Sequence, residues 1–276
     1  MKKGILYICP TPIGNLEDIT LRTLKVLEKV DLIAAEDTRR TIKLLNHYEI
    51  KKPLTSYHEH NERQKGDILI KKLEDGINIG LVSDAGMPGI SDPGEYLISQ
   101  AIDNDIELIV LPGGTAAISA LVLSGLPTGK FVFEGFLSSK KKDRRKALEK
   151  IKYEERTIIL YESPYRVLGL LKDIRDIMGN RKISVSREIT KVYEETIRGT
   201  VEEVLNSFQE KELKGEFVLT IEGGENKEVN YYENLTIKEH LTFYLDKGLT
   251  KKDAIKIVSK ERNMSKNIVY RESLDI

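Results

Sequence analysis

Short apolar runs alternate with amphipathic stretches along the first 124 residues of the chain. Five of these runs have the length of buried strands: Gly4–Cys9, Asp31–Ala35, Leu54–Tyr57, Ile77–Val82 and Glu107–Leu111. Helical patterns lie between them, as after the cap Thr20, where Leu21, Leu24 and Leu27 recur on one face. Strands and helices alternating at this spacing predict a parallel sheet with helices on both faces.

A second alternating pattern follows a boundary near Gly125–Gly129. Its predicted strands are Phe131–Glu134, Thr157–Tyr161, Ile183–Arg187 and Glu216–Ile221. Helices are expected between them, one starting at Ser163-Pro164 and ending at Gly179, another capped by Thr200 with Glu203. This pattern predicts a second α/β domain.

The composition changes after Gly223-Gly224, first to polar residues and then to a basic helical pair, Leu249–Ser259 and Ser265–Ser273, which resembles a helix-turn-helix. We therefore predict three parts: an N-terminal parallel α/β domain over residues 1–124, a second α/β domain over 125–226, and a helical basic tail over 227–276.

Two loops rich in Gly and Pro follow predicted strands. One is Cys9–Asn15, and the other runs from Ser83 to Gly94, where Asp92, Pro93 and Glu95 suit the N-cap, first residue and capping-box carboxylate of a helix. Either loop alone can be an ordinary strand–helix connection. Because ligands of parallel α/β sheets bind at the carboxyl ends of the strands, two such loops favour one shared pocket.

Composition narrows the function classes. The chain has 276 residues, of which 40% are hydrophobic, and 44 basic residues balance 44 acidic ones, so any nucleic-acid site must be local. The single cysteine, Cys9, excludes an intrachain disulfide and is typical of a cytoplasmic protein. The sequence contains no signal peptide pattern and no membrane-spanning run.

Motifs for phosphate and metal chemistry are absent from the sequence. It lacks both the P-loop pattern and Gly-x-Gly-x-x-Gly, and His58 with His60 lacks a nearby third metal ligand. We therefore expect no metal site. The remaining Gly/Pro loops suit an adenosyl ligand held by backbone groups, with Asp84 available for a ribose or amino group and Pro112–Thr115 offering amides at a helix start.

Six motifs in order carry a family resemblance: Pro10–Leu16, Glu36–Arg39, Ser83–Gly86 with Ile90–Gly94, Tyr161–Pro164, Arg187–Lys191 and Lys214–Glu216. With them the chain resembles the ribosomal RNA small-subunit methyltransferase I family, in the tetrapyrrole-methylase-type superfamily. Met87 departs from the usual Thr.

This resemblance implies S-adenosyl-L-methionine bound in a cleft between the two α/β domains, a homodimer, and methylation of a cytidine ribose 2′-OH in 16S ribosomal RNA at the decoding centre of the small subunit. The implied cofactor residues are Pro12, Ile13, Gly14, Ser83, Asp84, Ala85, Gly86, Met87, Thr115, Ala116 and Tyr161.

Methyl transfer to a ribose hydroxyl needs alignment and benefits from a general base. The candidates are Glu36, Asp37, Glu162 and Glu188, with Lys191 and Arg187 as partners. Each of them can instead be a strand-end charge in an ordinary ion pair.

Two basic segments are candidates for RNA contact. Ser138–Lys152 and Lys247–Arg271 each carry eight Lys or Arg against two acids, and their candidate contacts are Lys141, Arg144, Arg145, Lys251 and Lys252. Either segment can instead be a solvated helix face. Two rival functions remain open at this point: a small-molecule or protein methylase of the same superfamily, and a non-catalytic RNA-binding assembly factor.

Overall fold

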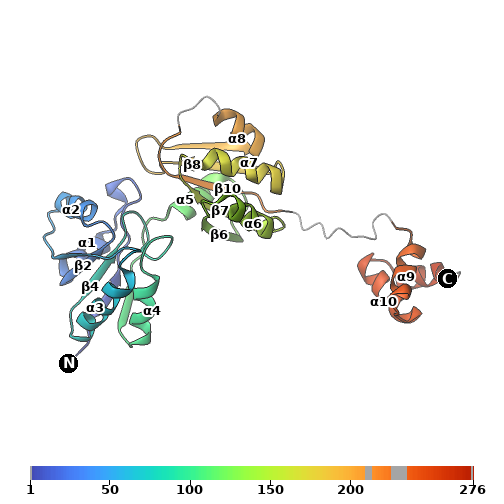
Figure 1. Ribbon diagram of the computed structural model, residues 1–276, viewed down its shortest axis with the longest axis horizontal. Coiled ribbons are helices and arrows are strands. Elements are labelled where there is room, and N and C mark those ends of the chain that lie inside the picture. The colour runs from blue at the N-terminus through green and yellow to red at the C-terminus, as the bar shows by residue number, and fades with distance from the viewer. Residues whose placement is uncertain (1, 209–212, 225–234, 275) are drawn as a thin grey trace. The chain divides into compact units, whose positions relative to one another are not determined.

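The computed structural model describes residues 2–208, 213–224, 235–274 and 276 (Figure 1). The chain divides at Gly224 into a compact unit that contains two five-stranded sheets and a second unit, whose described residues form three helices between Ile237 and Glu272. This architecture confirms the predicted α/β class with a helical tail. In the described residues, no helix is long and apolar enough to cross a membrane.

The first sheet is entirely parallel, as predicted. Its strands are β1 (Ile5–Ile8), β2 (Leu32–Ala35), β3 (Leu54–Ser56), β4 (Ile79–Val82) and β5 (Glu107–Val110), in the order β3-β2-β4-β1-β5. Successive residues of β1 enter different cores: Leu6 and Ile8 pack with α3 (Glu62–Glu74) and α4 (Glu95–Asp103), while Tyr7 packs with α1 (Leu21–Lys29) and α2 (Thr38–His47). Helices therefore cover both faces.

The second sheet is mixed, which the sequence did not reveal. Its strands are β6 (Phe131–Phe136), β7 (Thr157–Glu162), β8 (Lys182–Arg187), β9 (Glu195–Thr200) and β10 (Phe217–Ile221). They lie in the order β6-β7-β10-β8-β9, and β10 runs antiparallel to both of its neighbours. Strand β9 was not predicted, because its half-exposed residues Glu195–Thr200 lack an apolar run.

Helices cover both faces of this sheet as well. Ile158 and Leu160 of β7 pack into a core with α6 (Lys141–Ile151), α7 (Val167–Met178) and α8 (Val201–Phe208), whereas Ile159 faces α5 (Ala116–Ser124) on the other side. Helix α5 thus packs on the second sheet, although it precedes the predicted boundary at residue 125. The three-part division of the chain stays a prediction.

Two predicted helix starts are wrong. Helix α4 begins at Glu95 with Gly94, at φ 152°, as its N-cap residue, so Asp92 does not cap it. Instead, the carboxylate of Glu62 accepts the Gly94 N–H at 3.0 Å, a bond between segments 32 residues apart. Helix α7 begins at Val167, three residues after Pro164.

The second unit contains α9 (Ile237–Asp246), α10 (Lys251–Glu261) and α11 (Lys266–Glu272). Leu241, Ala254, Val258 and Val269 form its core. The predicted helical pair is present as α10, which Thr250 caps, and α11, which Ser265 precedes, whereas α9 was not predicted. Lys251 and Lys252 are exposed at the start of α10.

Candidate active site

The two loops rich in Gly and Pro lie side by side at the carboxyl ends of β1 and β4. The Thr11 N–H donates to the Gly86 carbonyl at 2.9 Å, and the Gly86 N–H donates back to Thr11 at 3.0 Å. Since β1 and β4 are neighbours in the sheet, the predicted convergence of the loops follows directly from the strand order.

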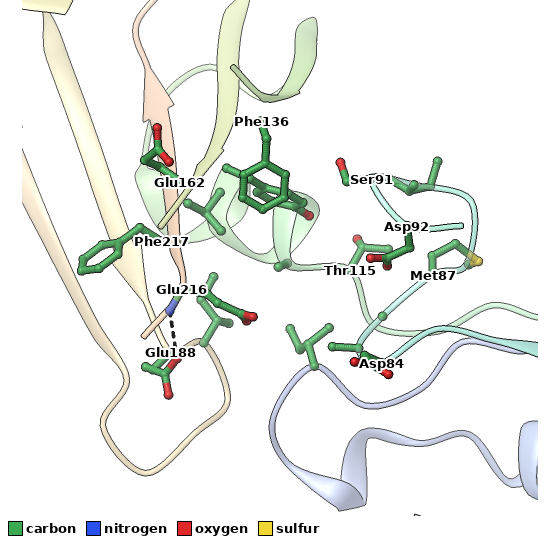
Figure 2. A pocket seen from close by; sticks show the side chains of 18 of the residues that line it. Asp84, Met87, Ser91, Asp92, Thr115, Phe136, Glu162, Glu188, Glu216 and Phe217 are labelled. Atoms are coloured by element: carbon green, nitrogen blue, oxygen red, sulfur yellow. Dashed lines mark hydrogen bonds between the residues drawn. The ribbon is translucent and has the colours of Figure 1, made fainter. Parts of the chain in front are cut away.

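A pocket of about 320 Å³ opens beside these loops, within the first unit (Figure 2). One side consists of loops that follow the first sheet, with Ile13, Glu36, Arg40, Asp84–Met87, Ile90–Asp92, Thr115 and Ala116. The other side is one end of the second sheet, where β6, β7 and β8 finish and β10 begins. Its lining residues are Phe136, Tyr161, Glu162, Glu188, Ile189, Lys191 and Glu216–Val218. This volume is within the range of small-ligand sites.

Most of the expected cofactor and catalytic residues line this pocket, but four of them do not, and neither does the proposed partner Arg187, which pairs with Glu195 of β9 at 2.9 Å. Pro12, Gly14 and Ser83 line a smaller neighbouring pocket, which shares Arg40 and Asp84 with the larger one. Asp37 is the fourth, and it caps α2 instead.

Gly14 allows the two sides of the pocket to meet. A Cβ at this position would lie 2.5 Å from the Lys191 side chain and 2.9 Å from the Ile189 carbonyl. Beside it, the Asn15 N–H donates to the Thr190 hydroxyl at 3.0 Å. The missing side chain therefore lets the β1 loop approach the loop that follows β8.

Glu36 and Asp84 are linked on the first-sheet side. The Glu36 carboxylate accepts the Asp84 N–H at 3.1 Å, and Asp84 accepts the Asp37 N–H at 3.0 Å and pairs with Arg40 at 3.2 Å. Burial raises the pKa of Glu36, although its hydrogen bond from Asp84 acts in the opposite direction. Asp84 thus holds the start of α2 as well as facing the pocket.

Asp37 is a poor candidate for a base. Its carboxylate receives hydrogen bonds from the Arg39 side chain at 2.7 and 3.0 Å and from the Arg39 N–H at 2.9 Å. These bonds lower the pKa of Asp37 to about 2. A carboxylate that is this weak a base has little tendency to take a proton near neutral pH.

Two further candidates, on the second-sheet side, are already paired. The buried Glu162 accepts the Ser163 N–H at 2.8 Å and pairs with Arg166 at 3.0 Å. Glu188 pairs with Lys191 at 3.0 Å and accepts the Glu216 N–H at 3.1 Å. Burial favours the neutral acid of Glu188, but these partners outweigh burial and lower its pKa.

Asp92, which sequence reasoning assigned to a helix cap, lines the pocket between Ser91 and the Thr115 loop (Figure 2). Burial, the largest cause, and the nearby carboxylates of Glu36, Asp84 and Glu216 together raise its pKa to about 7, although a hydrogen bond with Ser83 acts in the opposite direction. A carboxyl group with this pKa exchanges protons near neutral pH. The local pattern Ser-Asp-Pro-Gly is typical of a helix N-terminus, so the sequence alone did not indicate a role for Asp92 in the pocket.

The strand β6 is shaped to meet the Asp92 loop. It carries a bulge between Phe133 and Gly135, and Gly135 has a φ of 60°. A Cβ on Gly135 would lie 3.1 Å from the Ser91 hydroxyl, and Ser91 itself has a φ of 61°. Both sides of the pocket thus adopt uncommon backbone conformations where they touch, a frequent feature of functional sites.

The pocket is acidic. Its lining includes six carboxylates, Glu36, Asp84, Asp92, Glu162, Glu188 and Glu216, and two cations, Arg40 and Lys191. In the described part of the chain, no three His, Cys, Asp or Glu side chains gather as a metal site. Such a pocket attracts a cationic ligand and repels phosphate groups.

The Ser138–Lys152 segment differs from its expected role at Arg144. The Arg144 side chain is 8% exposed and pairs with the buried Asp173 of α7 at 2.6 Å, so it is not available to RNA in this structure. Arg145 also bonds to Asp173 at 2.6 Å. By contrast, Lys140, Lys141 and Lys142, called the α6 lysines below, are exposed.

Comparisons with known proteins identify relatives. Residues 5–205 match the family model of the tetrapyrrole (corrin/porphyrin) methylases. Ribosomal RNA small subunit methyltransferase I of Bacillus subtilis is 49% identical over 271 residues, 97% of this chain and 93% of that protein. The protein of the same name from Thermotoga maritima is 48% identical over 222 residues, 80% of this chain and 100% of its own length.

A solved structure with the same fold contains a bound ligand. It is a uroporphyrin-III C-methyl transferase from Thermus thermophilus complexed with S-adenyl homocysteine, which matches with a TM-score of 0.55 at 16% identity, over 78% of this chain and 97% of that chain. At this identity the likeness extends to the fold.

Proposed function

We propose that this chain, which belongs to the ribosomal RNA small subunit methyltransferase I family of the tetrapyrrole methylases, methylates the 2′-oxygen of a cytidine ribose in 16S ribosomal RNA. The methyl donor is S-adenosylmethionine, and the proposed target lies at the decoding centre of the small subunit. One observation carries the proposal: the loops that contain the family's motifs meet at one acidic pocket, which includes Asp92 with a pKa of about 7.

The pocket fits the proposed donor. S-adenosylmethionine brings a sulfonium and an ammonium group, and the six lining carboxylates are complementary to these positive charges. Asp84, Gly86, Met87, Thr115 and Ala116 would hold it, by carboxylate and backbone groups on the first-sheet side. The donor supplies an activated methyl group, and the chain aligns it with the substrate.

We assign the general base to Asp92. As the ribose oxygen bonds to the methyl carbon, the hydroxyl proton passes to the Asp92 carboxylate, and the electrons of the breaking carbon–sulfur bond go to sulfur. The alternatives Asp37, Glu162 and Glu188 are held by cations or amides, as described above. Glu36 also has a raised pKa, but its carboxylate accepts the Asp84 N–H.

Charge constrains how RNA approaches. An acidic pocket admits a nucleoside and repels the phosphates on either side of it, so cations outside the pocket must hold the backbone. The exposed α6 lysines, with Arg145 partly exposed beside them, are one such group, and Lys251 and Lys252 of the second unit are another. This division of roles favours an RNA substrate over a tetrapyrrole.

We also propose a homodimer. Ile118 and Val122, one turn apart on α5, are 45% and 70% exposed, and Val110 on the edge strand β5 is 53% exposed. Exposed apolar side chains on one helix face are typical of a protein interface. Light scattering would give a dimer mass for the native chain and a monomer mass for Val122→Asp.

Mapping of ribose methylation tests the function. Small subunits from cells that lack this protein would be incubated with the pure chain and labelled S-adenosylmethionine, and the RNA analysed by mass spectrometry. One new methyl on a cytidine ribose is the expected result. Label on a tetrapyrrole or a protein side chain would favour the rival methylase, and no heat on titration with S-adenosylmethionine would favour a non-catalytic RNA binder.

A further inference from the structure

Two tyrosines in loops that follow strands of the second sheet are largely exposed. Tyr165 is 95% exposed and Tyr193 is 76% exposed. They are called the rim tyrosines below. Nothing in the proposed reaction uses them, and rings left in water to this extent forgo the large burial that aromatic side chains normally gain.

The strand order places the loops that carry the rim tyrosines at the same end of the second sheet as the pocket. β6 is parallel to β7, and β7 and β8 are both antiparallel to β10. The carboxyl ends of β6, β7 and β8 therefore lie at the same end of the sheet. Tyr165 follows the pocket residue Glu162 by three positions, and Tyr193 follows Lys191 by two. Their backbones therefore lie within about 11 Å and about 7 Å of pocket residues.

Hydrogen bonds hold both loops in place. The Arg166 guanidinium donates to the Leu137 carbonyl at 2.5 Å and pairs with Glu162, which fixes the turn of Tyr165 beside the start of the Ser138–Lys152 segment. In the other loop, the Thr190 N–H donates to Glu194 at 2.6 Å and the Thr190 hydroxyl accepts the Asn15 N–H. The rings are thus presented on ordered backbone, which lowers the entropic cost of binding.

Positive charge lies on the segment that Arg166, the neighbour of Tyr165 in the chain, contacts. The α6 lysines follow Leu137 by three to five positions, and they are exposed. Exposed aromatic rings beside cations are the usual composition of a surface that binds unpaired nucleotides, since the rings stack on bases and the cations hold phosphates.

We infer that Tyr165 and Tyr193 stack on unpaired bases that flank the target nucleotide, while its ribose enters the pocket. This inference rests on the proposed RNA substrate. It adds a nucleobase-binding rim to a site whose interior repels phosphate, and it requires the target to be single-stranded around the methylated position. Stacking is sequence-tolerant, so the rim contributes affinity and positioning rather than base readout.

The absence of tryptophan from the chain gives a direct test. Tyr165→Trp and Tyr193→Trp each introduce one tryptophan, whose emission is quenched when a base stacks on it. A short single-stranded oligocytidylate should quench both variants to saturation, and heparin, a polyanion without bases, should not. Tyr153→Trp is the matched control, because Tyr153 is 56% exposed at the opposite edge, between α6 and β7, and its emission should stay constant.

Steady-state kinetics gives a second readout. Tyr165→Ala with Tyr193→Ala should raise the RNA KM by about 5- to 150-fold for each lost stack and leave S-adenosylmethionine affinity unchanged. Three results would each overturn the inference. The first is a wild-type KM in the double variant, and the second is equal quenching by heparin. The third is tryptophan emission that changes on dilution without RNA, as expected if a second copy of the chain covers the rim tyrosines. Failure of the wild-type chain to methylate RNA would instead refute the proposed function.

Discussion

Replacing Asp92 with asparagine tests the proposed base while keeping the size of the side chain. The amide that takes the place of the carboxylate cannot accept the ribose proton, so the Asp92→Asn variant loses proton transfer in the transition state. General-base catalysis by a positioned side chain contributes about 10²–10⁴-fold, which is the expected fall in kcat. The affinity for S-adenosylmethionine, measured by calorimetry, should change far less than kcat.

The pKa of Asp92 sets the pH dependence of the wild-type chain. With a pKa of about 7, the carboxylate is the reactive form above neutral pH and is lost as pH falls. The rate should therefore drop about tenfold for each unit below pH 7, and reach about 1% of its maximum near pH 5. The rate at saturating RNA and S-adenosylmethionine would be measured over this pH range. The wild-type chain should show the fall in rate at low pH, called the acid limb, and Asp92→Asn should lack it.

Stability provides a readout that is independent of activity. The folded pKa of Asp92 is raised above its ordinary value of 3.8, so the folded chain binds the proton more tightly than the unfolded chain. This contribution to stability is present below about pH 4 and is lost as pH rises to about 7. Asp92→Asn should therefore raise Tm near pH 8 and leave it almost unchanged near pH 4. A variant that keeps the acid limb, or loses less than tenfold in kcat, would refute the assignment.

Four other outcomes follow from the site and its surroundings. Asp84→Ala should weaken S-adenosylmethionine binding by roughly 1–3 kcal/mol, and unchanged affinity in calorimetry would remove Asp84 from the site. Arg144→Ala should lower the free energy of unfolding in urea by about 3 kcal/mol, because it leaves the buried Asp173 with only Arg145. Serine in place of the α6 lysines should flatten the log–log salt dependence of RNA binding by roughly 0.7 per lost contact, and an unchanged slope would make them a solvated face. Methyltransferase activity should persist in the presence of a metal chelator. Activity that is abolished by the chelator and restored by magnesium would contradict this expectation, unless the metal acts by folding the RNA.

Local patterns were enough for most of the elements. The apolar runs of β1, β2 and β4 predicted strands because burial on both faces requires nearly continuous apolar residues. Caps were also readable, as in Thr200 with Glu203, whose reciprocal hydrogen bonds are present. The order of the family motifs further indicated the family, the fold and the methyl donor.

Tertiary structure decided what each charged residue near the site can do. Asp92 had a local explanation as a helix cap, but Glu62, 30 residues earlier, occupies that role and leaves Asp92 facing the pocket. Arg144 belonged to a basic run, yet its partner Asp173 lies on another helix and buries it. A pattern over a few neighbouring residues predicts helices and strands, because the hydrogen bonds of these elements and the direction of their side chains repeat about every two to four residues. The pKa of a carboxyl group and the exposure of a cation depend instead on groups that only the packing of distant segments brings together, and the chain order does not contain those distances.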